Sequence, residues 1–63
     1  SNMTKEYSKI TECIESSKTK KQFDACDRLI SLFEKRCHYT DEPDTEFMLS
    51  NLKVRLYKKK LVI

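Results

Sequence analysis

Apolar side chains recur along this chain at intervals of three and four residues, which is the spacing of an amphipathic helix. The pattern divides the chain into three segments, which we expect to form helices at about 4–16, 20–38 and 41–59. The connections between them are then two to four residues long, a length that favours antiparallel neighbours. The predicted fold class is therefore all-α, either a small three-helix bundle or a helical hairpin with a third helix.

The first segment is an ordinary amphipathic helix. Its apolar residues share one side of the helix: Tyr7, Ile10, Cys13 and Ile14. Thr4 precedes this stripe and is the expected N-cap, because a threonine hydroxyl can accept a hydrogen bond from an unpaired first-turn amide.

The second segment has the most regular pattern. Its stripe follows a 3-4-3-4 spacing through Phe23, Cys26, Ile30, Phe33 and Cys37. Thr19 and Gln22 predict a capping box, in which each side chain binds the backbone amide of the other residue. Three further apolar residues, Ala25, Leu29 and Leu32, widen the apolar side to about half the circumference. We therefore expect this helix to lie at the centre of the bundle.

The third segment carries apolar residues on two opposite sides. One stripe holds Met48, Leu49, Leu52 and Leu56, and the other holds Phe47, Val54, Tyr57 and Leu61. A helix on the surface of a monomer needs only one such stripe. The second stripe is therefore the candidate interface with another chain, and self-association through this helix is the use we expect.

The two ends of the third segment differ in charge. The start is acidic, with Asp41, Glu42, Asp44 and Glu46, and the end is basic, with Lys53, Arg55, Lys58, Lys59 and Lys60. Both clusters suit the helix macrodipole, and we interpret the acids as capping groups rather than as an acid–base pair. Thr40 or Asp41 is the expected N-cap, with Pro43 in the first turn, where its missing amide hydrogen is not needed. An antiparallel pair of such helices sets the acidic start of one against the basic end of the other.

Composition restricts the class of protein. The chain has 63 residues, no glycine and one proline, which argues against β-rich folds and against glycine-rich nucleotide loops. Charged residues make up 37% and apolar residues 38%, values that fit neither a disordered chain nor a membrane protein. Ser1 and Asn2 resemble residues left by removal of an expression tag, so Met3 is the expected native start. With no signal peptide in view, we expect a cytoplasmic protein.

The cysteines suggest packing rather than chemistry. Cys13, Cys26 and Cys37 form an odd set, which we interpret as reduced thiols that pack as small apolar groups. Together with His38 they have the residue types of a zinc site, but no two cysteines have the spacing of a zinc finger. Cys37 and His38 are adjacent on a helix and diverge by about 100°, which argues against a nucleophilic pair. We expect no metal, no cofactor, no catalytic residue and no small-molecule substrate.

The basic end of the chain supports an alternative function. From residue 47 onward there are five lysines or arginines and no acid, so Lys53, Arg55, Lys58, Lys59 and Lys60 are candidate phosphate contacts of a small nucleic-acid-binding accessory protein. The net charge is only +3, and these cations scatter around the helical wheel. The acidic start of the segment also argues against insertion into a DNA groove.

The leading hypothesis is a small non-enzymatic protein–protein interaction module, expected as a homo-oligomer or bound to another protein, with no membrane contact. In general character the chain is similar to short helical proteins of bacteria and phages, although no motif identifies a family.

Overall fold

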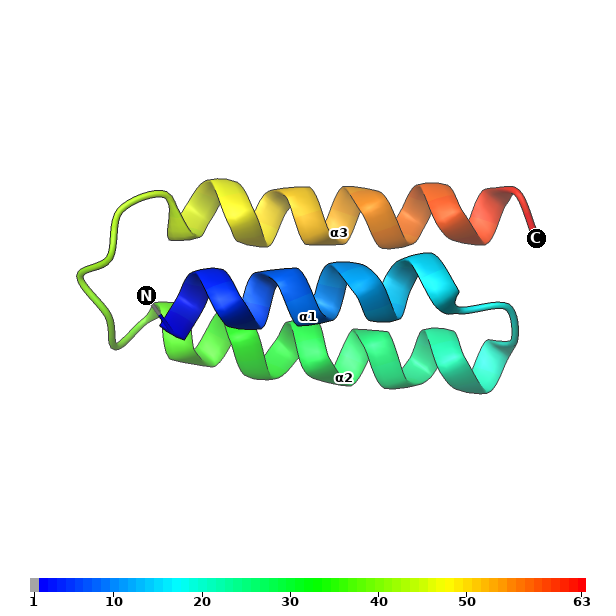
Figure 1. Cartoon of the computed structure of the whole chain (residues 1–63), viewed down its shortest axis with the longest axis horizontal. Coiled ribbons are helices and arrows are strands. Elements are labelled where there is room, and N and C mark those ends of the chain that lie inside the picture. Colours follow the sequence, from blue (N-terminus) through cyan, green and yellow to red (C-terminus); the bar gives the residue numbers. More distant parts are fainter. Residues whose placement is uncertain (1) are drawn as a thin grey trace.

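The computed structural model describes residues 2–63, and over this range the protein is a bundle of three α-helices without a strand. Helix α1 spans Asn2–Ser16, α2 spans Lys20–Cys37 and α3 spans Thr45–Leu61. Figure 1 shows that α2 runs antiparallel to both α1 and α3, and each helix contacts the other two. The predicted all-α three-helix bundle is confirmed. The expectation that Ser1 remains from an expression tag lies outside the described residues.

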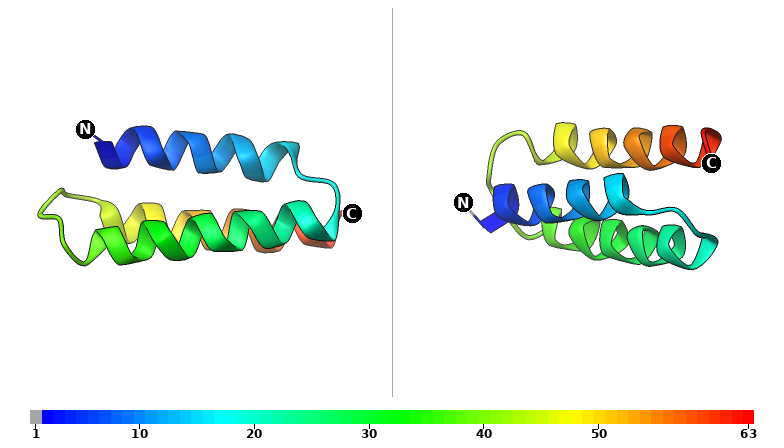
Figure 2. Two further views of the ribbon diagram at one scale, coloured as in Figure 1. Left: turned by 90° about the horizontal axis from the view of Figure 1, so that it is seen from below. Right: turned by 45° about the vertical axis from the view of Figure 1, so that its right-hand side comes forward.

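Helices α1 and α3 run in the same direction at a constant register. The Tyr7 hydroxyl donates to Asn51 Oδ1 at 2.5 Å, and Lys59 Nζ donates to the carbonyl oxygen of Glu15 at 2.7 Å. Both pairs are separated by 44 positions. The same offset at Tyr7 and at Glu15, two positions well apart on α1, means that the two helices stay aligned between these contacts. The right-hand view in Figure 2 shows α1 and α3 running in the same direction as neighbours.

The core lies along the common axis of the three helices. Its buried residues are Met3, Ile10 and Ile14 from α1, Phe23, Cys26, Ile30 and Phe33 from α2, and Leu52 and Leu56 from α3. The expectation that α2 lies at the centre of the bundle is wrong, because each helix contacts the other two and the added apolar residues Leu29 and Leu32 of α2 are 39% and 54% exposed. In a three-helix bundle each helix has two neighbours and faces solvent elsewhere, so only one stripe of α2 is covered.

The connection between α1 and α2 confirms the predicted capping box. The amide of Gln22 donates to Thr19 Oγ1 at 3.2 Å, and the amide of Thr19 donates to Gln22 Oε1 at 3.1 Å. The same Gln22 oxygen accepts from the amide of Lys18 at 2.6 Å. This short connection reverses the chain with no glycine, because side-chain acceptors satisfy the first amides of α2.

The start of α1 differs from the prediction. The helix begins at Asn2, so Thr4 lies within its first turn and is not the N-cap. Helix formation extends toward the N-terminus because Met3 is buried in the core and anchors that turn.

The start of α3 also differs from the prediction. The helix begins at Thr45 and not at Asp41, so the connection from α2 covers residues 38–44 and exceeds the expected length. Asp44 occupies the N-cap position with φ 66°, in the left-handed region, and makes no side-chain cap. Pro43 disfavours a helical conformation at the residue before it, and Thr40 Oγ1 instead accepts from the amide of Glu42 at 3.2 Å. The acids at 41, 42 and 44 therefore precede the helix.

Candidate functional site

The candidate interface residues lie on the side of α3 that faces away from the bundle. Phe47 is 69% exposed, Tyr57 is 64% exposed and Leu61 is 67% exposed, and Val54 is exposed as well. The other stripe faces inward, with Leu52 and Leu56 buried and Met48 and Leu49 packed against the core. One helix thus presents an apolar surface to solvent along its whole length while it completes the core on its opposite side.

Ser50 belongs to the same exposed surface, and sequence reasoning missed it. Phe47, Ser50, Val54, Tyr57 and Leu61 follow a 3-4-3-4 spacing, and we call these five residues the outer seam. This spacing keeps side chains in one line along a helix and is typical of the contact line of a coiled coil. Ser50 is exposed like its neighbours. A search for apolar residues passed over it because it is polar, although the spacing alone identifies its position.

Two of the candidate phosphate contacts pair with α2. Lys53 Nζ lies 3.6 Å from Glu34 Oε1, and Lys60 Nζ lies 3.3 Å from Asp27 Oδ2. A step of seven residues along α3 matches a step of seven in the opposite direction along α2, as expected for antiparallel helices. Exposed ion pairs contribute little to stability, so they specify alignment more than they hold the helices together.

Two further cations pair with α1. Arg55 lies 3.7 Å from Glu15 Oε1 and also donates from Nε to Asn51 Oδ1 at 2.7 Å. Lys59 donates to the carbonyl oxygen of Glu15. Lys58, the fifth cation, is exposed beside the outer seam. Four of the five basic residues therefore contact the other two helices from opposite flanks of α3, an arrangement unlike one continuous phosphate-binding surface.

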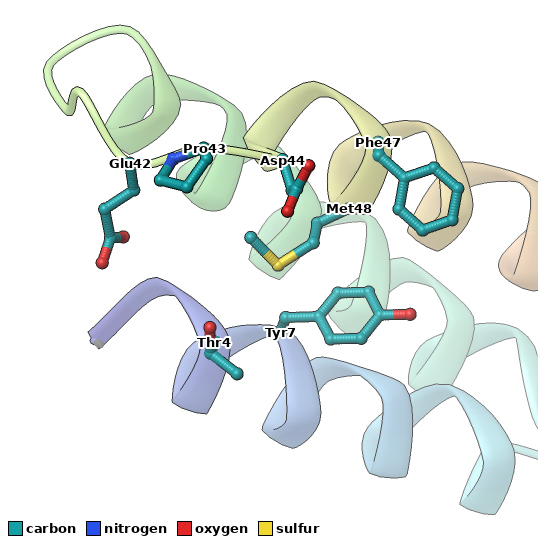
Figure 3. Close-up of a pocket in the computed structure, with 7 residues that line it drawn as sticks. All are labelled: Thr4, Tyr7, Glu42, Pro43, Asp44, Phe47 and Met48. Carbon is teal, nitrogen blue, oxygen red and sulfur yellow. The ribbon is translucent and has the colours of Figure 1, made fainter.

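An open pocket of about 720 Å³ lies where the start of α1 meets the start of α3. It is lined by Thr4, Tyr7, Glu42, Pro43, Asp44, Phe47 and Met48, shown in Figure 3. Met48 extends toward α1, and Phe47 lies at the side of the pocket away from Glu42. Glu42 Oε2 is buried and makes no hydrogen bond with any described residue. The pocket joins the outer seam at Phe47 and has a mixed acidic and apolar lining.

The cysteines divide into a pair and a separate thiol. Cys13 Sγ and Cys26 Sγ are 3.4 Å apart, and all three cysteines are free thiols. The hydrogen bond with Cys26, together with burial, raises the pKa of Cys13. Burial raises the pKa of Cys37, which contacts the carbonyl oxygen of Thr45 at 4.0 Å. Within residues 2–63 no group of three or more histidine, cysteine or acidic side chains is placed to hold a metal ion.

Comparisons with known proteins add no functional information. No protein family model, curated protein or solved structure matches this chain. Among the described helices, none has both the length and the apolar character needed to cross a membrane.

Proposed function

We propose that this protein is a small non-enzymatic interaction module of the cytoplasm that pairs with a second copy of itself through the outer seam of α3. The observation that carries the proposal is the exposure of four large apolar side chains, Phe47, Val54, Tyr57 and Leu61, in one line on a helix whose other side is already buried. Burying such side chains against a partner removes apolar area from water, which is the main favourable term in protein association.

The charges beside the seam favour an antiparallel pair. In a parallel pair, Lys53 on one edge of the seam lies close to Lys58 on the opposite edge of the partner, and these like charges repel. In an antiparallel pair, Glu46 near the start of one helix lies close to Lys60 near the end of the other, and two-fold symmetry makes this contact twice. The only like charges brought together along this edge are Lys53 and its own copy near the two-fold axis, so the attractive contacts outnumber the repulsive one. The antiparallel arrangement also sets the two helix dipoles in opposition, which is the favourable orientation.

The spacing of the seam predicts a register for this pair. With the two-fold axis level with Leu52, Phe47 packs against Tyr57 of the partner and Ser50 against Val54 of the partner. The exposed C-terminal residues Leu61–Ile63 then pass the partner's Phe47 and reach the pocket beside Pro43. That pocket has an apolar wall, so it suits the apolar C-terminal tail of a second chain.

Sedimentation velocity over a concentration series, at low and high salt, tests the proposal. We expect a monomer–dimer equilibrium, with Tyr57→Glu shifting the chain to monomer because a carboxylate cannot be buried in the seam without a partner. Tyr39 is 91% exposed and lies off α3, so Tyr39→Glu is the matched control and leaves the equilibrium unchanged. A wild-type chain that remains monomeric at high micromolar concentration would contradict self-association.

A salt series separates the two contributions to the pair. If association weakens at high salt, the contacts between Glu46 and Lys60 contribute to the free energy of dimerisation. If it is unchanged, burial of the apolar seam accounts for that free energy.

A further inference from the structure

We propose that Cys13 and Cys26 form a dithiol site that a small-molecule disulfide oxidises to an intramolecular disulfide between α1 and α2. The two sulfur atoms are 3.4 Å apart, and they come from different helices whose alignment the core fixes. A disulfide bond is about 2.05 Å long, so a small adjustment of the two side chains brings the sulfurs to bonding distance. The site is independent of the outer seam, which lies on α3.

Hydrogen bonds orient the two thiols. The Ser17 hydroxyl donates its single hydrogen to the carbonyl oxygen of Cys13 at 2.7 Å, because a carbonyl oxygen can only accept. Ser17 Oγ is also 3.2 Å from Cys26 Sγ, so in that contact the Cys26 thiol is the donor. The Cys13 thiol then donates to Cys26 Sγ across the 3.4 Å contact. This chain of donors holds the Cys26 sulfur between Ser17 and Cys13.

Burial makes the two thiols unequal in access. Cys26 is fully buried, with 0% of its surface exposed, whereas Cys13 is only partly buried. An oxidant from solution therefore reaches Cys13 first, and Cys26 is protected from it. This asymmetry is the arrangement of an attacking thiol and a resolving thiol.

The chemistry takes two exchange steps. The Cys13 thiolate attacks one sulfur of a small-molecule disulfide such as oxidised glutathione, forms a mixed disulfide and releases one glutathione thiolate. The Cys26 thiolate then attacks Cys13 Sγ and releases the second glutathione. The two protein thiols give up two hydrogens and two electrons, and the glutathione disulfide takes them up as two thiols. In a reducing cytoplasm the site rests as the dithiol and closes when the ratio of disulfide to thiol rises.

The rate of the first step depends on pH. The hydrogen bond with Cys26 and burial raise the pKa of Cys13, so less thiolate is present at neutral pH than for an ordinary cysteine. Because the thiolate is the nucleophile, we expect the exchange to accelerate as the pH rises toward the ordinary thiol range and beyond it.

Peptide mapping after oxidation tests the site in the whole chain. Wild-type protein is incubated under native conditions with oxidised glutathione, the remaining thiols are blocked, and tryptic peptides are identified by mass. Each cysteine lies in its own peptide, at 10–18, 22–28 and 37–53. We expect the dominant product to be peptide 10–18 linked to peptide 22–28. Thermal unfolding of the oxidised protein should also show a Tm about 10 °C higher than that of the reduced protein, because the disulfide closes a loop between two helices.

The matched control is the same reaction in denaturant. There, Cys26 and Cys37 are closer in sequence than Cys13 and Cys26, so a link between 22–28 and 37–53 forms at least as readily. The proposal is supported if the Cys13–Cys26 disulfide exceeds the Cys26–Cys37 disulfide in the native chain but not in denaturant. Equal amounts of the two disulfides in both conditions would overturn it.

Two variants separate the roles of the thiols. Cys37→Ser retains Cys13 and Cys26. On oxidation this variant is expected to lose both free thiols, and its mass should be lower than that of the reduced variant by two hydrogens. Cys26→Ala removes the resolving thiol and is expected to accumulate the glutathione adduct at Cys13. A stable glutathione adduct on Cys37→Ser would contradict the proposal, because it would mean that Cys26 does not attack, and this result does not depend on whether Cys26→Ala folds.

Discussion

Helix α3 has two apolar sides of similar composition and opposite surroundings. Leu52 and Leu56 on its inner side are buried by α1 and α2, whereas Val54 and Tyr57 on its outer side are exposed. Both sides have the spacing of a helix contact line, and both occur on the same turns. The comparison teaches that an apolar stripe on a helix predicts that the stripe is buried. Whether helices of the same chain or a second chain bury it depends on how the other helices pack.

The largest expected effect separates the two sides by stability. Leu52→Ala leaves a cavity in the core, because Leu52 is fully buried, and should lower the free energy of unfolding by about 2–5 kcal/mol. Val54→Ala, two residues away on the outer side, should lower it by less than about 0.5 kcal/mol in the monomer. Urea unfolding followed by circular dichroism at low protein concentration measures both. Equal losses of unfolding free energy for the two variants would contradict the difference in burial between the inner and outer sides of α3.

The next effect strengthens the outer side instead of weakening it. Ser50 is the polar residue at the middle of the seam, and a two-fold dimer buries two copies of it. Ser50→Leu should therefore tighten self-association about a hundredfold, because each buried leucine side chain contributes about 1.5 kcal/mol and the dimer buries two. Sedimentation equilibrium measures the dissociation constant. Ser8→Leu, at an exposed position of α1, is the control and should leave association unchanged. If both variants associate more tightly, the cause is nonspecific hydrophobic association and not burial in the outer seam.

The smallest effect concerns the hydrogen bond between Tyr7 of α1 and Asn51, which lies on α3 between its buried and exposed sides. Tyr7 donates to Asn51, which also accepts from Arg55, so Tyr7→Phe removes one of two hydrogen bonds to the same oxygen. We expect a loss of about 1 kcal/mol in the free energy of unfolding, read from the urea midpoint. Tyr57→Phe is the control, because Tyr57 lies on the exposed seam. A loss for Tyr57→Phe as large as that for Tyr7→Phe would show that the hydroxyl at position 7 has no special role.

The sequence was informative where a local signal is complete in itself. The capping box at Thr19 and Gln22 formed as predicted, because both partners lie within one turn and need no other part of the chain. The start of α3 was predicted wrongly. Pro43 can occupy a first helical turn, but here Asp44 adopts a left-handed conformation so that the chain crosses from the end of α2 to a helix on another side of the bundle.

The candidate sites show the same division. The exposed stripe of α3 was visible from spacing alone, whereas Ser50 was missed because its side chain gives no apolar signal. The Cys13–Cys26 pair was not predictable, since thirteen positions separate the two residues and their contact depends on how α1 and α2 pack. The pairing of Lys53, Arg55 and Lys60 with acids of the other helices depends on the same packing.

The sequence by itself determined that this protein forms three helices, that one of them has an apolar side in excess, and that α2 is capped by its own residues. These properties follow from the period of 3.6 residues and from contacts within a turn. Only the tertiary structure decided where α3 begins, which side of it is covered, and that Cys26 is buried beside Cys13 and Ser17. Such properties depend on the direction and register of helices that lie far apart in the chain, and the local pattern contains no information on either.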